Sequence, residues 1–83
     1  MAWHVYIAQC RDGSLYTGIS TDPPRRLEKH NAGQGSKYVR RKGGATLVYA
    51  EMQNTKSAAR RRELKIQSWS RHKKLALIDH GSR

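Results

Sequence analysis

The sequence predicts a single small α+β domain, in which helices pack on a three-stranded sheet with antiparallel or mixed pairing. Three observations support this class. Residues 3–9 and 15–19 alternate between two sets of side chains with a period of two, and a third strand-like run covers residues 46–51. Capped stretches of helix-forming residues surround that third run. The predicted order is ββαβαα, and 83 residues suffice for one domain, 1–83, with a core of about 3–79 and frayed residues 80–83.

The first two strands should form a β-hairpin whose register follows from the alternation. A two-residue turn at Asp12–Gly13 would put the aliphatic residues of the two strands on opposite faces, because a slip of one residue flips every side chain. A loop of three or five residues is therefore favoured. It gathers the aliphatic residues on one face: Val5, Ile7, Leu15 and Ile19. Tyr6, Tyr16 and Gly18 then share the other face.

Capping residues place the helices. Thr21 or Asp22 is a good N-cap for a helix over about 22–32, its prolines fit the first turn, and Gly33 suits its end. Residues 34–44 are basic and bracketed by glycines, which favours a loop with at most one helical turn. A second helix is expected from Thr55 to about Ser68. Ser70 should cap a final helix over 71–80 that Gly81 closes.

The charge points to an anionic partner. Seventeen Lys and Arg residues face six Asp and Glu residues, a formal net charge of +11, and such an excess repels itself unless phosphates neutralise it. A membrane surface is disfavoured, because no segment joins a basic face to a large apolar one. The lone Cys10 offers neither a disulfide nor a zinc cluster. The first residues lack the features of a signal peptide, so a soluble, cytoplasmic protein is expected.

Gly18 raises a question, because a glycine inside a strand weakens it. One interpretation is an ordinary strand pair with half-buried tyrosines. The other is that Gly18 lets a ligand approach the strand beside the hydroxyls of Tyr6 and Tyr16. A tyrosine is a poor base near neutral pH unless cations lower its pKa. Arg26 could supply such a cation, and it lies on the same helix face as His30, four residues later.

Glu63 is the lone acid within the basic run ARRRELK. A salt bridge with Arg60 would be an ordinary role and would stabilise little. However, its neighbours Ala59 and Ile66 put Glu63 at the border of the apolar stripe. A carboxylate in such a setting can hold a divalent cation together with water and substrate phosphate.

These residues together resemble the GIY-YIG nuclease family. The resemblance rests on VY at 5–6, YTG at 16–18, Arg26-Leu27, His30-Asn31 and a glutamate in a later helix, and it extends from Trp3 to about Trp69. The small stand-alone YhbQ-like branch is most similar, since 33-GQGSKYVR-40 also matches its loop. The sequence departs from the family pattern at His4 and Thr17. It also has Ile19 or Ser20 where some members carry a lysine, and a late asparagine has no counterpart.

The resemblance implies a metal-dependent endonuclease that hydrolyses nucleic-acid phosphodiester bonds, DNA being favoured over RNA, with a role in DNA repair or processing. It implies one Mg²⁺ or Mn²⁺ at Glu63, Arg26 as the phosphate clamp, and Tyr6 or Tyr16 as general base. His30 would assist as hydrogen-bond partner or proton acceptor. Gly18 would admit the backbone of the substrate, and further phosphate contacts are expected from Lys37, Arg40, Arg41 and Arg60.

Two other interpretations stay open. The chain could be a basic nucleic-acid-binding module with weak or no catalysis, whose specificity comes from its own surface or from a protein partner. It could also be an RNA-associated basic protein, although the capped and patterned elements disfavour folding that depends on RNA. Glu63 and a metal distinguish the binding module from an enzyme, because a binding module needs only the Lys and Arg surface.

Overall fold

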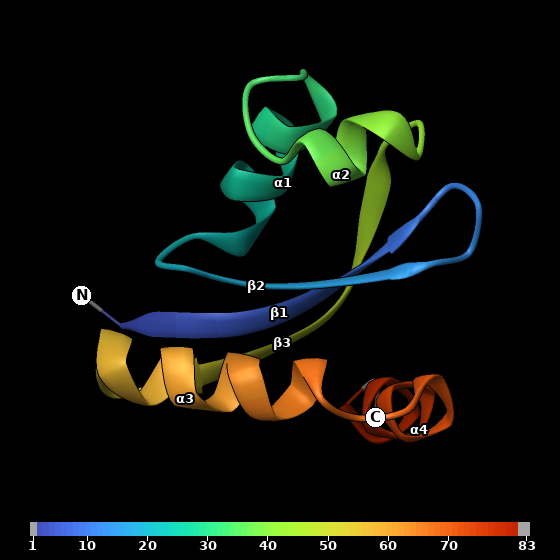
Figure 1. Ribbon diagram of the computed structural model, residues 1–83. Helices are drawn as coiled ribbons and strands as arrows, with labels where there is room; N and C mark the ends of the chain where they lie inside the picture. The colour runs from blue at the N-terminus through green and yellow to red at the C-terminus, as the bar shows by residue number, and fades with distance from the viewer. Residues whose placement is uncertain (1, 82–83) are drawn as a thin grey trace.

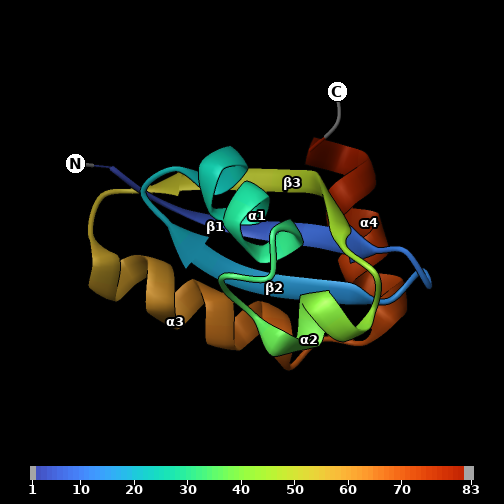
Figure 2. The same ribbon diagram turned by 90° about the horizontal axis from the view of Figure 1, so that it is seen from above.

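The computed structural model describes residues 2–81, and its sheet lies between two layers of helices (Figure 1). The elements are β1 (Trp3–Cys10), β2 (Leu15–Ser20), α1 (Pro23–Asn31), α2 (Lys37–Arg41), β3 (Ala45–Gln53), α3 (Lys56–Gln67) and α4 (Arg71–Gly81). Helices α1 and α2 cover one face of the sheet, and α3 and α4 cover the other (Figures 1 and 2). The predicted α+β class and three-stranded sheet are confirmed. None of the helices over residues 2–81 is long and apolar enough to cross a membrane.

All strand pairing is antiparallel, in the order β2-β1-β3. Across the hairpin Val5 pairs with Ile19 and Tyr6 with Gly18, so the predicted register is confirmed. The connecting loop is of the short kind expected: the Cys10 amide donates to the Ser14 carbonyl at 2.8 Å, with three residues between them. The tyrosines of the hairpin therefore share the face that α1 covers.

A β-bulge in β3 adjusts the alternation on the other side of β1. Ile7 pairs with Tyr49 and Ala8 pairs with Leu47, which leaves Val48 as the extra residue. An extra residue lets both ends of a strand direct apolar side chains inward despite the fixed period of two. Leu47 consequently packs beside Ala8, while Tyr49 packs beneath the sheet.

The core is divided by the sheet into two parts. Beneath it, β1 buries Val5 and Ile7 completely against Ala59 and Ile66 of α3. Above it, a smaller cluster joins Tyr6 and Ala8 to Leu27 of α1. Tyr16, Ala45 and Leu47 border this upper cluster. The upper layer is therefore built around a tyrosine, and its polar hydroxyl must find partners there.

The helices start at the predicted caps. Asp22 accepts from the Arg25 amide and Thr55 from the Ala58 amide. Helix α1 ends in a Schellman motif: Gly33, with φ of 81°, donates to the His30 carbonyl, and the next amide donates to that of Lys29. The last helix includes His80 and Gly81, which were expected to be frayed, and residues 82–83 lie outside the described part.

One expectation needs correction. Residues 34–44 were expected to form a loop with at most one helical turn, yet they contain α2, a helix of five residues. Ser36 caps it by accepting from the Val39 amide, and the Val39 side chain is fully buried. Burying that side chain provides the anchoring that the local sequence of glycines and cations does not indicate.

Candidate active site at the β2 edge

Tyr6 reaches across the edge strand, over Gly18. A Cβ placed on Gly18 would lie 2.6 Å from the Tyr6 hydroxyl oxygen and 2.7 Å from Cζ, far inside ordinary contact distance. The space over Gly18 thus holds the phenol of Tyr6, which is 1% exposed. Gly18 lets Tyr6 extend toward the edge of the sheet. That substrate backbone also approaches here stays a prediction.

His30 of α1 meets Tyr6 from above. Its Nε2 lies 3.2 Å from the Tyr6 hydroxyl oxygen, and its Nδ1 accepts from the Ser36 amide at 2.6 Å. His30 is 1% exposed, although it lies in a strongly basic helix. A polar side chain buried this deeply is kept in the fold by the hydrogen bonds of both ring nitrogens.

Burial governs the acid–base properties of this pair. Removal from water raises the pKa of the Tyr6 hydroxyl, and so does Tyr16, while the nearby Arg26 guanidinium acts in the opposite direction. Burial also lowers the pKa of His30, and the positive charge of Arg26 lowers it further. Both groups are therefore held in their neutral forms. A neutral Tyr6 is a hydrogen-bonding group and a poor general base.

Tyr16 lies between the buried pair and the solvent. Its ring centroid is 6.2 Å from that of Tyr6 and 5.5 Å from that of His30. On its outer side it stacks with Tyr38 of α2, at 6.0 Å and an interplanar angle of 29°. The sequence thus correctly places Tyr6 and Tyr16 together, and only Tyr16 is partly exposed.

Tyr38 belongs to the site although the sequence did not single it out. It is 42% exposed, and the ammonium of Lys42 lies 5.5 Å from its ring centroid. The signal that could have found it is its position two residues after Ser36, in the loop motif that resembles the family. Its ring extends the aromatic cluster from the buried Tyr6 out to the surface.

Glu63 approaches from the opposite layer, on α3. It is 7% exposed, and Arg60 forms a salt bridge with it. Gln67, one turn later, reaches both Glu63, at 3.5 Å, and the Thr17 carbonyl of β2, at 3.4 Å. The charge of Glu63 is close enough to raise the pKa of the Tyr6 hydroxyl further. Glu63 therefore lies beside β2, under the edge that Tyr6 crosses from above.

The residues around Glu63 fit a cation that the substrate helps to hold. Among residues 2–81 no group of three or more His, Cys, Asp or Glu side chains could bind a metal by itself. Mg²⁺, however, is commonly held by one carboxylate, waters and substrate phosphate. Arg60, whose side chain is 58% exposed, can turn away into solvent and free the Glu63 oxygen that it occupies.

Arg26 lines a depression of ≈ 540 Å³ at the start of α1. Arg25 and Lys29 also line it, together with His4, one of the residues that depart from the family pattern. Among the described residues, the Nδ1 atom of His4 is the buried side-chain atom that lacks a hydrogen-bond partner. The depression continues the basic surface away from Tyr6, and Arg26 lies between the depression and the cluster of Tyr6 and His30.

The remaining predicted phosphate ligands divide between two layers. Lys37, Arg40 and Arg41 line a shallow recess of ≈ 370 Å³ on α2, whereas Arg60 lies on α3. The sheet separates these helices (Figure 1). Arg62, two residues after Arg60, pairs with Glu51 at 3.0 Å and covers the Trp69 ring. Arg62 therefore has a structural role.

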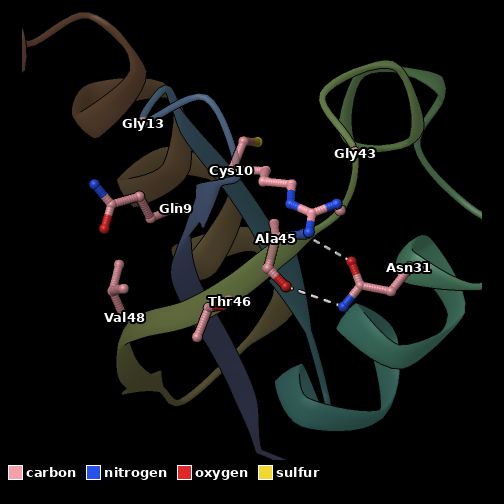
Figure 3. A pocket seen from close by; sticks show the side chains of 10 residues that line it. Gln9, Cys10, Gly13, Asn31, Gly43, Ala45, Thr46 and Val48 are labelled. Atoms are coloured by element: carbon pink, nitrogen blue, oxygen red, sulfur yellow. Dashed lines mark hydrogen bonds between the residues drawn. The ribbon is translucent and has the colours of Figure 1, made fainter.

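A further hollow of ≈ 640 Å³ lies elsewhere, at the hairpin end of β1 (Figure 3). Asn31 closes one side of it by donating to the Ala45 carbonyl at 2.9 Å and accepting from its amide at 2.8 Å. The buried thiol of Cys10 and the glycines before β3 form other parts of the wall. Asn31 thus fastens the end of α1, and with it His30, to the first residue of β3.

Comparisons with known proteins identify a family. Residues 2–76 match the model of the GIY-YIG catalytic domain. The chain is 51% identical to the UPF0213 protein SSP2268 of Staphylococcus saprophyticus over 78 residues, covering 94% of this chain and 95% of that protein. It is 54% identical to a UPF0213 protein of Staphylococcus aureus over 74 residues, covering 89% and 90%.

Two solved structures are also similar. The solution structure of the UPF0213 protein BH0048 from Bacillus halodurans has a TM-score of 0.60 and 43% identity, covering 95% of this chain and 84% of that one. The solution structure of EF2693 from E. faecalis has a TM-score of 0.65 and 32% identity, covering 96% and 85%. Both support the fold described above.

Proposed function

The chain belongs to the GIY-YIG family, among its small UPF0213 proteins, and we propose that it is a metal-dependent nuclease that cleaves phosphodiester bonds of nucleic acid, DNA in preference to RNA. One observation carries the proposal: Tyr6, Tyr16, His30 and Arg26 meet on one side of the β2 edge, and Glu63 lies under the other. Hydrolysis of a phosphodiester needs an oriented water, a cation on the phosphate and help for the leaving oxygen.

We propose different tasks for the two tyrosines, because they differ in burial. Tyr6 is buried and neutral, so it serves as a fixed hydrogen-bonding group at the edge. Tyr16 is the one of the two that solvent reaches, and as general base it would take the proton of the water whose oxygen attacks phosphorus. The bond from phosphorus to the leaving oxygen breaks, and that oxygen takes a proton from solvent.

Charge stabilisation comes from both sides of the strand. Arg26 binds the scissile phosphate with its guanidinium, whose planar donors suit phosphate oxygens. Glu63 would hold Mg²⁺ or Mn²⁺, which, when bound, stabilises negative charge on the phosphate and the leaving oxygen. Lys37, Arg40 and Arg41 would bind phosphates farther along the chain. Gly18 would act through Tyr6, since it leaves room for the phenol to extend to the edge where the substrate would lie.

A second candidate function rests on the Arg60–Glu63 salt bridge. If Arg60 never leaves the carboxylate, Glu63 is a structural residue and the protein is a nucleic-acid-binding module without catalysis. The basic surface would serve either function equally. The state of Glu63 thus distinguishes the two candidates, and that residue is the first to change.

Glu63→Gln removes the charge and keeps the size, and Glu51→Gln is a matched control, since Glu51 is also partly buried and paired with an arginine. Plasmid, branched and single-stranded DNA and RNA would be incubated with each variant in Mg²⁺, Mn²⁺ or EDTA. We expect Glu63→Gln to abolish cleavage and keep binding, and Glu51→Gln to cleave. Arg26→Ala should lose cleavage with a modest loss of binding, because many other cations share the phosphates.

Thermal melts show whether each variant is folded. A folded Glu63→Gln protein that cleaves at the wild-type rate would remove the metal site and favour the binding module. Cleavage that persists in EDTA would contradict the metal requirement. The preferred substrate in the same assay distinguishes DNA from RNA. A role in DNA repair or processing in the cytoplasm, with a partner protein that adds specificity, completes the proposal.

A further inference from the structure

The contacts of His30 fix which ring nitrogen carries its proton. The amide of Ser36 points at Nδ1 from 2.6 Å, and a backbone amide can only donate. Nδ1 must therefore be the unprotonated nitrogen that accepts. A neutral imidazole has one N–H, so Nε2 carries it, 3.2 Å from the Tyr6 oxygen. His30 consequently donates to Tyr6, and the Tyr6 oxygen accepts.

We propose that the loop residues Gly35 and Ser36 are positioning residues of the active site, which hold His30 as its Nε2–H tautomer so that it donates a hydrogen bond to Tyr6 and does not accept the proton of Tyr6. The catalytic part of this proposal rests on the proposed nuclease function. The proposal also replaces the alternative, drawn from the sequence, in which His30 is a proton acceptor. His30 could accept from Tyr6 only with its proton on Nδ1, where the Ser36 amide would then face a second donor.

Gly35 is required because the loop passes directly over the imidazole. A Cβ on Gly35 would overlap Nδ1 and crowd Cε1, at 2.7 Å, and Cγ, at 3.1 Å. These are atoms of a buried ring, not the far end of a flexible side chain, so they have little room to move. Only glycine at this position lets the following amide come within hydrogen-bond distance of Nδ1.

The loop is held at both ends, so its position is not set by His30 alone. Before it, Gly33 ends α1 in the Schellman motif. After it, Ser36 begins α2 as N-cap, and Val39 anchors that helix in the interior. The motif GQGSKYVR therefore has a physical role: it ends one helix, passes over His30, supplies one amide and starts the next helix.

The tautomer of His30 decides in which direction the hydroxyl proton of Tyr6 points. Because the Tyr6 oxygen accepts from His30, its own O–H is free to point away, toward Tyr16 and the phosphate beside it. Protonating His30 would require breaking the hydrogen bond with Ser36. Arg26 on α1 faces the imidazole, and its positive charge opposes a second proton. The other titratable groups on this side are Tyr6 on β1 and Tyr16 on β2, with Tyr38 of α2 behind Tyr16.

The test compares Ser36→Pro with Ser36→Ala. Both variants lose the hydroxyl that caps α2, but only proline also lacks the amide donor. Ser36 has φ of −64°, which proline adopts without strain, so the backbone can keep its course. Nitrogen-15 NMR of the histidine rings would report the tautomer, and a scalar coupling between the Ser36 amide nitrogen and His30 Nδ1 would report the hydrogen bond directly.

We expect wild type and Ser36→Ala to show the Nε2–H tautomer and the coupling, with His30 neutral well below its ordinary pKa. Ser36→Pro should lose the preference for one tautomer and titrate at higher pH. Its cleavage rate at neutral pH should fall by up to about 100-fold, as for a misplaced catalytic group, and should fall much further than that of Ser36→Ala, which keeps the amide donor. Rates would be measured across pH, because a general loss of stability would not move the acid limb of the profile.

Wild-type spectra decide the matter even if Ser36→Pro does not fold. An Nδ1–H tautomer, a mixture of tautomers or a missing coupling in the wild type would overturn the proposal, whatever the activity. The ring signals do not depend on cleavage. An inactive protein with the expected tautomer would therefore contradict the nuclease function and leave the role of the loop intact.

Discussion

Replacing Gly18 with alanine should disturb the site through Tyr6, because the new methyl group would lie where the phenol now is. Three atoms of Tyr6 would be 2.6, 2.7 and 2.9 Å from that carbon, against ordinary separations of about 3.4–4 Å. The ring would have to move by close to 1 Å, and it is 1% exposed, with Leu27 and Ala8 packed against it. Movement of that size also breaks its hydrogen bond to His30.

The magnitude follows from three contributions. Overpacking a core costs about 1–3 kcal/mol. Losing the hydrogen bond between Tyr6 and His30 adds about 0.5–1.5 kcal/mol, and the greater backbone order of alanine in a strand returns about 0.5–1 kcal/mol. We expect Gly18→Ala to lower the free energy of unfolding by about 0.5–4 kcal/mol, with Tm falling by about 4–8 °C for each kcal/mol in a domain of this size.

Urea and thermal unfolding would measure the cost, and a double-mutant cycle with Tyr6→Leu would locate it. Leucine lacks the distal atoms of the phenol, so Gly18→Ala should cost little in that background. We expect a coupling energy of about 1–3 kcal/mol between the two positions. If Gly18→Ala is as stable as wild type, or costs the same in both backgrounds, Gly18 does not serve to accommodate Tyr6.

The remaining predictions concern charge. Lys37, Arg40 and Arg41 would each be replaced by alanine, and the DNA affinity would be measured at several salt concentrations. For every phosphate that the protein no longer neutralises, the slope of log K against log salt should fall by about 0.9 on duplex DNA. Unchanged slopes in all three variants would exclude α2 from the interface. Burial opposes ionisation of Glu51, but hydrogen bonds from Tyr49 and Arg62 outweigh it and lower its pKa. Its stabilisation should thus be full above the ordinary value of 4.5 and fade as pH falls through the lowered pKa. In urea unfolding at several pH values, the gap between wild type and Glu51→Gln should narrow in acid, and a constant gap would contradict the assignment.

The strands and helix caps could be predicted because they depend on neighbours in the sequence. Alternation with a period of two decides which residues share a face, so the meeting of Tyr6, Tyr16 and Gly18 followed from the hairpin register before any contact was known. Asp22, Thr55 and Gly33 likewise act on amides and carbonyls within a few residues of themselves.

Other features arise only from packing between distant segments. Tyr6 and His30 are 24 residues apart, and nothing local indicates that the layer above the sheet buries both. The same packing made α2 a helix, brought Tyr38 to Tyr16 and carried the Ser36 amide to His30.

Short stretches of the chain are enough to specify most of the secondary structure, the hairpin register and the residues that could carry chemistry. The folded arrangement is needed to learn that Tyr6 is buried and neutral, that Tyr16 is the tyrosine open to solvent, and which nitrogen of His30 holds its proton. Desolvation and hydrogen-bond direction depend on what surrounds a side chain in space, and those neighbours come from other elements of the fold.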